Sequence, residues 1–122
     1  VAALAEQGMA GKVPVSGLDC TVQALQLILL GQMTQSVWRD FDMMAEATAK
    51  ATVALINEDS LDGIVMGTST ANSAGKEVPM VPVGFYNAVG EAGVQYVIDN
   101  DPSITKADVC KGEAAATSFC KG

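Results

Sequence analysis

Residues 11–19 of the chain read Gly-Lys-Val-Pro-Val-Ser-Gly-Leu-Asp, and residues 34–39 read Thr-Gln-Ser-Val-Trp-Arg. Each stretch is short and β-prone, so each predicts a strand. Between them, Thr21 precedes a segment, residues 22–30, whose apolar residues recur with helical spacing, and Gly31 follows as a helix stop. This strand–helix–strand order is a βαβ unit. It predicts an α/β fold with a parallel sheet and helices on both faces.

A longer helix is expected after the second strand. Asp40 or Asp42 is predicted to cap its N-terminus, and the helix runs to about Glu58. Two of its methionines are candidates for a soft metal site, but a methionine stripe at helical spacing is typical of a core. The stripe comprises Met43, Met44, Ala47, Ala51, Ala54 and Leu55.

The second half of the chain is expected to be less regular. Residues 64–66 predict a short strand, and residues 68–76, rich in Ser, Thr and Asn, predict an exposed loop. Residues 78–85 contain two prolines, which each remove a backbone donor, so this stretch predicts an edge strand or a chain crossing. A short helix or turn is expected at 93–98, and Thr105 is expected to begin another helix.

The composition excludes several classes of partner. The chain carries 14 acidic and 7 basic residues, for a net charge of −7, and the basic residues are scattered. Nucleic acid and anionic membrane surfaces are therefore poor partners. The chain has no histidine, which removes the commonest general base and metal ligand, and we expect neither a metal nor a cofactor. The longest apolar run, residues 27–30, is far shorter than the roughly 20 residues of a membrane-spanning helix.

The three cysteines indicate the redox environment in which the protein works. Cys110 and Cys120 lie close together in a polar tail, without a histidine or a second cysteine pair to form a zinc site. We expect them to form a disulfide, which implies an oxidising compartment; the alternative is two unpaired thiols in a cytosolic protein. Cys20 is expected to be free and buried, as a small hydrophobe.

Two charged residues are candidates for binding a ligand. Asp19 and Arg39 each lie at the carboxyl end of a predicted strand, where open α/β sheets bind their ligands. A carboxylate accepts hydrogen bonds and a guanidinium donates five, so together they suit a ligand that does both. The alternatives are a helix-capping Asp19 and a solvated surface Arg39.

Residues 11–19, 21–26 and 30–40 resemble the late strands of the type I periplasmic sugar-binding proteins, the soluble capture components of ABC importers. The Val78–Pro79 stretch and the ending at Cys110 also fit, and the xylose-binding branch fits best. The resemblance implies part of a two-lobe fold with parallel sheets flanked by helices.

The same resemblance implies how the chain is divided. Residues 1–37 would belong to the C-terminal lobe, residues 38–77 to a hinge crossing and part of the N-terminal lobe, and residues 78–122 to the return crossing and the C-terminal tail. The missing N-terminal portion of the same protein would complete both lobes. The first residues read as the end of a helix, so we expect this chain alone not to be compact and Met43, Met44 or Leu55 to be exposed.

By resemblance, Asp19 and Arg39 bind a monosaccharide, and the partner is the membrane permease of an ABC importer. The location implied is the periplasm or another extracytoplasmic space, with a lipid anchor on the missing N-terminus as one option. Leu18 replaces a common Gln and Cys20 a common Ala, which leaves the sugar's identity open. Trp38 is expected to pack behind the hinge, since alternate strand residues face opposite sides.

Two other functions compete with sugar capture. The effector domain of a sugar-responsive transcriptional repressor shares the implied fold, but a cytosolic repressor has no need of a terminal disulfide. An enzyme with Cys20 as nucleophile beside Asp19 would lack the histidine that usually activates a thiol. We therefore expect a binding protein and not an enzyme.

Overall fold

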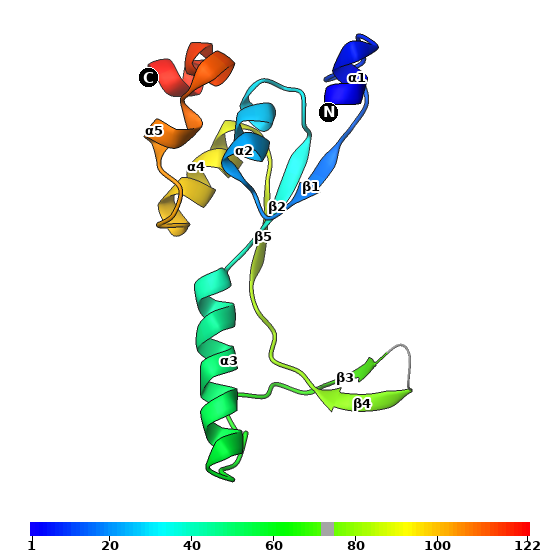
Figure 1. Ribbon diagram of the computed structural model, residues 1–122, viewed down its shortest axis with the longest axis vertical. Helices are drawn as coiled ribbons and strands as arrows, with labels where there is room; N and C mark the ends of the chain where they lie inside the picture. The colour runs from blue at the N-terminus through cyan, green and yellow to red at the C-terminus, as the bar shows by residue number, and fades with distance from the viewer. Residues whose placement is uncertain (72–74) are drawn as a thin grey trace. The chain divides into compact units, whose positions relative to one another are not determined.

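The computed structural model describes residues 1–71 and 75–122, which form two units. The first unit comprises residues 1–39 and 85–122, and the second comprises residues 40–84. The chain combines helices with a mixed sheet (Figure 1), which confirms the predicted α/β class.

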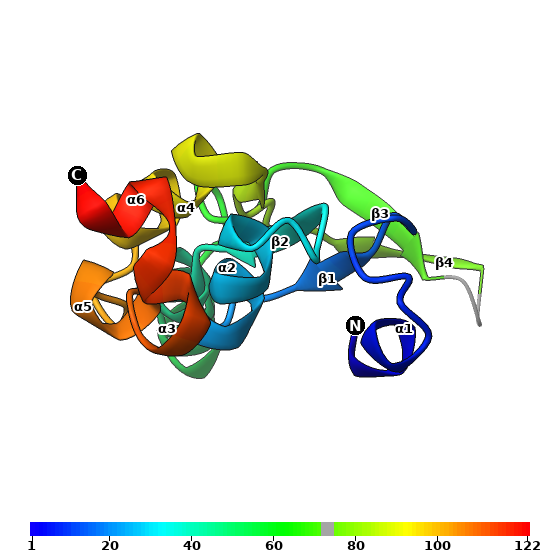
Figure 2. The ribbon, with the colours of Figure 1, turned by 90° about the horizontal axis from the view of Figure 1, so that it is seen from above.

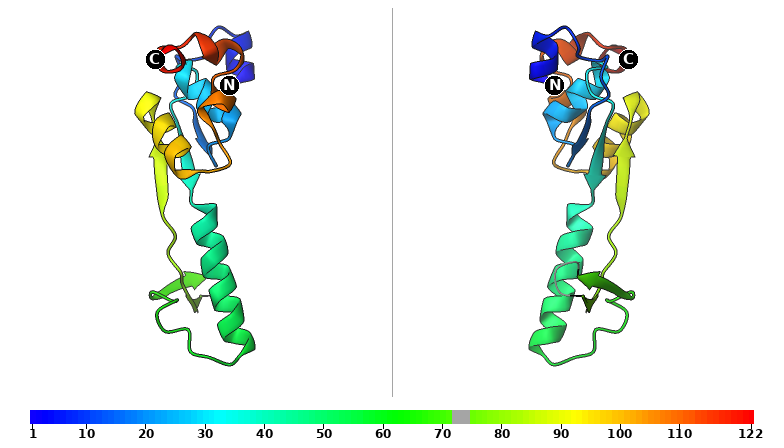
Figure 3. Two further views of the ribbon diagram at one scale, coloured as in Figure 1. Left: turned by 90° about the vertical axis from the view of Figure 1, so that its left-hand side faces the viewer. Right: turned by 90° about the vertical axis from the view of Figure 1, so that its right-hand side faces the viewer.

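The first unit is built on a three-stranded sheet. Its strands are β1 (Ser16–Leu18), β2 (Gln35–Arg39) and β5 (Phe85–Ala88), in the order β1-β2-β5. β1 and β2 are parallel, as predicted, but β5 is antiparallel to β2 (Figure 3), so the expectation of an all-parallel sheet is wrong for the third strand. The chain leaves the sheet at Arg39 and returns beside it at Phe85, so β5 runs back along β2.

One face of this sheet is buried and the other is open. Along β2, Ser36 and Trp38 are buried while the residues between them are half-buried. The helices that follow β1 in this unit gather beside the strands (Figures 1 and 2), so the sheet is flanked by helices, as expected. These helices are α2 (Val22–Leu29), α4 (Gly90–Asn100), α5 (Lys106–Val109), the 3-10 helix η1 (Gly112–Ala116) and α6 (Ser118–Lys121).

Local signals fix where these helices begin. Thr21 caps α2 by accepting a hydrogen bond from the Ala24 amide, and Thr105 caps α5 in a reciprocal capping box with Asp108. A short helix, α1 (Ala2–Glu6), precedes the sheet. The core of the unit is apolar and comprises Cys20, Leu25, Ile28, Trp38, Ala88, Val94, Val97, Ile104 and Val109.

The C-terminal tail is fastened to the helices. Cys110 and Cys120 form the expected disulfide. The Gln26 side chain of α2 donates to the Val109 carbonyl at 3.1 Å, and the Ser118 hydroxyl donates to Glu91 of α4. The tail therefore belongs to the packed part of this unit.

The second unit consists of one helix and one hairpin. α3 (Phe41–Ile56) begins where Asp40 accepts from the Met43 amide at 2.8 Å, as predicted, and it ends slightly before the expected Glu58. β3 (Thr68–Ala71) and β4 (Lys76–Pro79) pair in antiparallel fashion. The exposed loop expected at 68–76 is thus largely a hairpin, apart from residues 72–74, which lie outside the described residues.

The strand expected at 64–66 is also absent from the described structure, which has a single bridge between Asp62 and Val65 there. The hairpin forms although its residues are polar, because β-branched Thr residues favour an extended backbone and the two strands satisfy each other's backbone hydrogen bonds.

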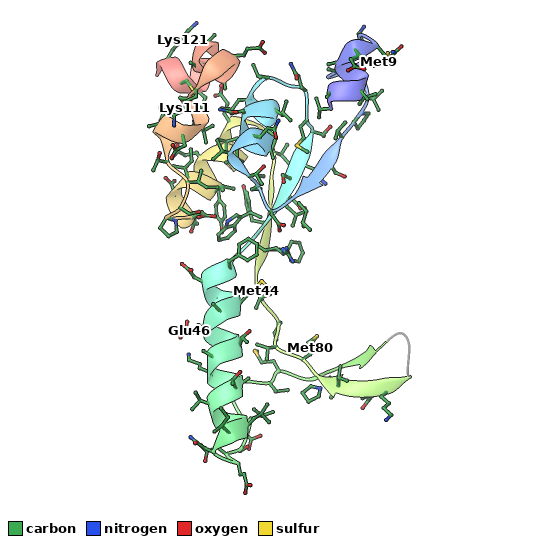
Figure 4. All side chains as sticks on the ribbon, in the orientation of Figure 1. Met9, Met44, Glu46, Met80, Lys111 and Lys121 are labelled. Carbon is green, nitrogen blue, oxygen red and sulfur yellow. A yellow bond between two sulfur atoms is a disulfide. The ribbon has the colours of Figure 1, made fainter. Side chains whose placement is uncertain are left out.

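The apolar stripe of α3 is mostly uncovered in this chain. Met43 and Leu55 are exposed, as expected, and Leu55 is 64% exposed. Met44, labelled in Figure 4, lies on the same helix. It lines an apolar groove of about 340 Å³ together with Leu55, Val81 and Val83. Across the described part of the chain, no helix combines the length and apolar character needed to cross a membrane.

Candidate functional site

Two oppositely charged side chains meet at one edge of the three-stranded sheet. Asp19 follows the last residue of β1, and Arg39 is the last residue of β2. Because β1 and β2 are parallel, their carboxyl ends lie at the same edge. The structure therefore brings together the two ligand-binding candidates that the sequence analysis identified.

The backbone at Asp19 turns sharply to achieve this. Asp19 and Cys20 both have left-handed backbone conformations, with φ of 71° and 43°. Two such residues in succession are unfavourable without glycine and need outside support. The support comes from the Asp19 amide, which donates to the Val37 carbonyl at 2.7 Å, and the Cys20 amide, which donates to the Ser36 hydroxyl at 3.2 Å.

The Asp19–Arg39 contact is close and partly open to solvent. Asp19 Oδ1 accepts from Arg39 Nε at 2.8 Å and from Nη2 at 2.6 Å. The two side chains are 37% and 36% exposed, respectively. Asp19 Oδ2 accepts no hydrogen bond from any of the residues that the structure describes, so this oxygen is available to a ligand.

This pair offers an acceptor and a donor fork side by side, with no net charge between them. Two neighbouring hydroxyls of a neutral polyol match that pattern, since each hydroxyl both donates and accepts. Because the two charges offset each other, the pair offers no net charge to attract an ionic ligand. Within residues 1–71 and 75–122, no cluster of three or more Cys, Asp or Glu side chains could hold a metal ion.

Trp38 lies on the other face of the sheet from this pair. It is buried in the core, its Nε1 donates to Asp101 Oδ2 at 3.1 Å, and Tyr96 packs edge-on against it. The expectation that Trp38 faces away from Arg39 is confirmed.

Cys20 is buried and free, as expected. Burial is the main cause that raises the pKa of its thiol, and the charges of Asp19 and Asp101 raise it further, while the hydrogen bond with Ser36 opposes them. A buried thiol with a raised pKa is a poor nucleophile, which weighs against the enzyme hypothesis.

Sequence reasoning missed two residues of this edge. Ser36 is fully buried and supports the turn at Cys20, and Phe85 is 72% exposed and directly opposite Arg39 in the register of β2 and β5. The sequence carries no signal that singles out Phe85, because Phe85 and Tyr86 are both aromatic; only burial along β5 separates the exposed Phe85 from the half-buried Tyr86.

Similarity to known proteins covers about two thirds of the chain. Over 79 residues, which is 65% of this chain and 23% of the relative, the sequence is 29% identical to a D-xylose-binding periplasmic protein of Haemophilus influenzae. Over 81 residues, with the same coverage, it is 32% identical to a D-xylose-binding periplasmic protein of Escherichia coli. The chain thus spans about a quarter of the length of these relatives, and no family model matches it.

Proposed function

We propose that this chain is part of the solute-binding component of an ABC sugar importer, which captures a monosaccharide reversibly and without catalysis. The observation that carries the proposal is the Asp19–Arg39 pair, held at the carboxyl edge of two parallel strands with one carboxylate oxygen open. The similarity to D-xylose-binding periplasmic proteins supports the same reading. The implied partner is a membrane permease that recognises the sugar-loaded protein.

The proposal places the sugar between two lobes. Residues 1–37 and the tail at 78–122 contribute to the C-terminal lobe, and residues 38–77 contribute the hinge crossing and part of the N-terminal lobe. The division of the chain into two units, with boundaries at Arg39 and Phe85, supports a two-lobe arrangement. In this proposal, an N-terminal portion outside these 122 residues supplies the rest of each lobe, because the chain spans about a quarter of the length of the similar D-xylose-binding proteins. The Cys110–Cys120 disulfide supports an extracytoplasmic location.

The test uses the whole protein that contains this sequence, in a thermal-shift screen against monosaccharides. A sugar at 100 times its dissociation constant should raise the free energy of unfolding by about 2.7 kcal/mol. Asp19→Ala and Arg39→Ala should each weaken binding of that sugar at least about tenfold, because charge-assisted hydrogen bonds contribute about 1.5–3 kcal/mol.

A second ion pair on the chain provides a matched control. Glu46 and Lys50 form a comparably short, exposed contact of 2.6 Å on α3. Glu46→Ala and Lys50→Ala should leave sugar affinity unchanged. If the Asp19 and Arg39 variants bind the sugar as tightly as the parent does, the site assignment is wrong; if the parent binds no monosaccharide, the function is wrong.

A further inference from the structure

An aromatic cluster, Trp38 with Tyr86 and Tyr96, lies on the face of the sheet opposite the candidate site. Trp38 of β2 and Tyr86 of β5 are register partners, so their side chains leave the same face. Tyr96 of α4 stacks on Tyr86, with ring centroids 3.7 Å apart, and meets Trp38 edge-on at 6.0 Å. The cluster therefore joins both strands to α4, one residue inside the boundaries of the first unit at Arg39 and Phe85.

The indole of Trp38 also has a polar anchor. Its Nε1 donates to Asp101 Oδ2 at 3.1 Å, and Asp101 directly follows α4 as its C-cap. The other carboxylate oxygen, Oδ1, accepts from the Ser103 amide at 3.0 Å and from the Ser103 hydroxyl at 2.5 Å. Burial disfavours the ionised carboxylate, but the hydrogen bonds from Ser103 and Trp38 outweigh it and lower the pKa of Asp101. Trp38 thus donates to a charged acceptor that is itself held in place, and such hydrogen bonds are stronger than neutral ones.

This anchor matters because the next residue along β2 is Arg39. Arg39 ends the strand, and the chain enters the second unit at Asp40. The ends of secondary-structure elements open more readily than their interiors. Successive side chains of a strand leave opposite faces, so an anchor on Trp38 restrains the backbone from which Arg39 reaches Asp19 on the other face.

We propose that Asp101 is a positioning residue of the candidate site: by holding Trp38 it fixes the end of β2, and with it the Arg39 guanidinium beside Asp19. The inference rests on the proposed function and adds to it a residue that acts from the far face of the sheet. Binding requires Arg39 in its place, so the apparent affinity falls with the fraction of molecules in which Arg39 is held there.

The experiment measures sugar affinity by calorimetry on the whole protein that contains this sequence, with D-xylose, D-ribose and D-glucose as ligands. Asp101→Ala should weaken binding of the preferred sugar about three- to tenfold, as expected if Arg39 is in place in about a third to a tenth of the molecules. Trp38→Phe keeps an aromatic ring but removes the N–H, and it should weaken binding by a similar factor. Asp101→Asn retains an oxygen that can accept from Trp38, so its affinity should stay within about twofold of the parent's.

Two further variants distinguish positioning from general destabilisation. In the Arg39→Ala background, Asp101→Ala should change the affinity by less than about twofold, because the effects of residues that act through one another do not add. Val109→Ala is the matched control: Val109 is fully buried in the same core but lies in α5, outside the strands that carry the site. This variant should lower the thermal stability at least as much as Asp101→Ala does and leave the sugar affinity unchanged.

Three outcomes would overturn the positioning role. Asp101→Ala could leave the affinity unchanged, its effect could persist in full without Arg39, or Val109→Ala could weaken binding equally. In each case Asp101 is only a structural residue, and the proposed function still stands as long as Arg39→Ala weakens binding. If the parent binds none of the three sugars, both proposals are overturned.

Discussion

At the scale of single residues, the candidate site depends on the side-chain hydroxyl of Ser36, which lies beneath it. Ser36 is fully buried, and its Oγ accepts the hydrogen bond of the Cys20 amide. That bond holds one of two successive left-handed residues, and the other, Asp19, carries the carboxylate. The geometry of the candidate site therefore depends on a buried polar contact behind it.

Removal of this hydroxyl should be costly. Ser36→Ala leaves the Cys20 amide buried and unpaired, so we expect the free energy of unfolding to fall by about 1–3 kcal/mol in denaturant titrations. Ser16→Ala, on the exposed end of β1, is the control and should stay within about 0.5 kcal/mol of the parent. Equal effects of the two substitutions would show that the turn does not need Ser36.

The thiols give a second residue-scale prediction. Without reductant, the native chain should show no rapidly reacting thiol, because Cys20 is buried with a raised pKa and Cys110 and Cys120 are bonded. Unfolding in denaturant should expose one thiol per chain, and reduction should expose three. Three reactive thiols in the unreduced protein would contradict the disulfide and favour the cytosolic repressor alternative.

At the scale of elements, the capping box at the start of α5 changes the pKa of one carboxyl group, that of Asp108. Asp108 accepts from the Thr105 hydroxyl and amide and pairs with Lys111 Nζ at 2.9 Å. The Thr105 hydrogen bond is the main cause, and Lys111 the next, that lowers the pKa of Asp108 from 3.8 to about 2. The folded state therefore favours the ionised carboxylate more than the unfolded state does.

The sign of the pH dependence follows from that shift. A lowered pKa contributes stability that is fully present above the unfolded value of 3.8 and is lost as the pH falls to about 2. Asp108→Asn removes the titrating group, so the difference in unfolding free energy between the parent and this variant should shrink between pH 5 and pH 2. A difference that stays constant over this range would show that the charge of Asp108 does not stabilise the capping box.

The same elements show what the sequence could predict. The caps at Thr21, Asp40 and Thr105 were predictable because a short polar side chain satisfies a nearby amide, which is a local interaction. The β1–β2 pairing was predictable from the βαβ order. The direction of β5 was not, because it depends on where the chain re-enters the sheet after 45 residues, Asp40–Gly84, that form a separate unit.

The residues of the candidate site also fall into those that the sequence could predict and those that it could not. Asp19 and Arg39 were identified because the ends of consecutive parallel strands must share an edge. Phe85 and Ser36 were missed, since the first needed the antiparallel register and the second needed the left-handed turn at Cys20. Neither is a property of the neighbouring sequence.

At the scale of the whole molecule, the two units differ in how much apolar surface they bury. In the first unit, α4 buries Gly93, Val94 and Val97 against the core. In the second, Ala54 is the one buried residue of α3 among those described, although the helix has 16 residues. A helix of this length is only marginally stable in water without a packed face. Its cap at Asp40 and the Glu46–Lys50 pair add little, because both are exposed.

The rate of amide hydrogen exchange in α3 should therefore depend on the rest of the protein, whereas the rate in α4 should not. In a polypeptide of residues 1–122, the amides of α3 should exchange at least tenfold faster than those of α4. In the whole protein, α3 should gain at least tenfold protection, since covering one side chain such as Leu55 contributes about 1.5–3 kcal/mol and 1.4 kcal/mol is tenfold. The protection of α4, which already packs in the first unit, should change little. Equal protection of α3 in the two samples would mean that nothing outside these 122 residues covers its apolar stripe, and the two-lobe assignment would then lose its basis.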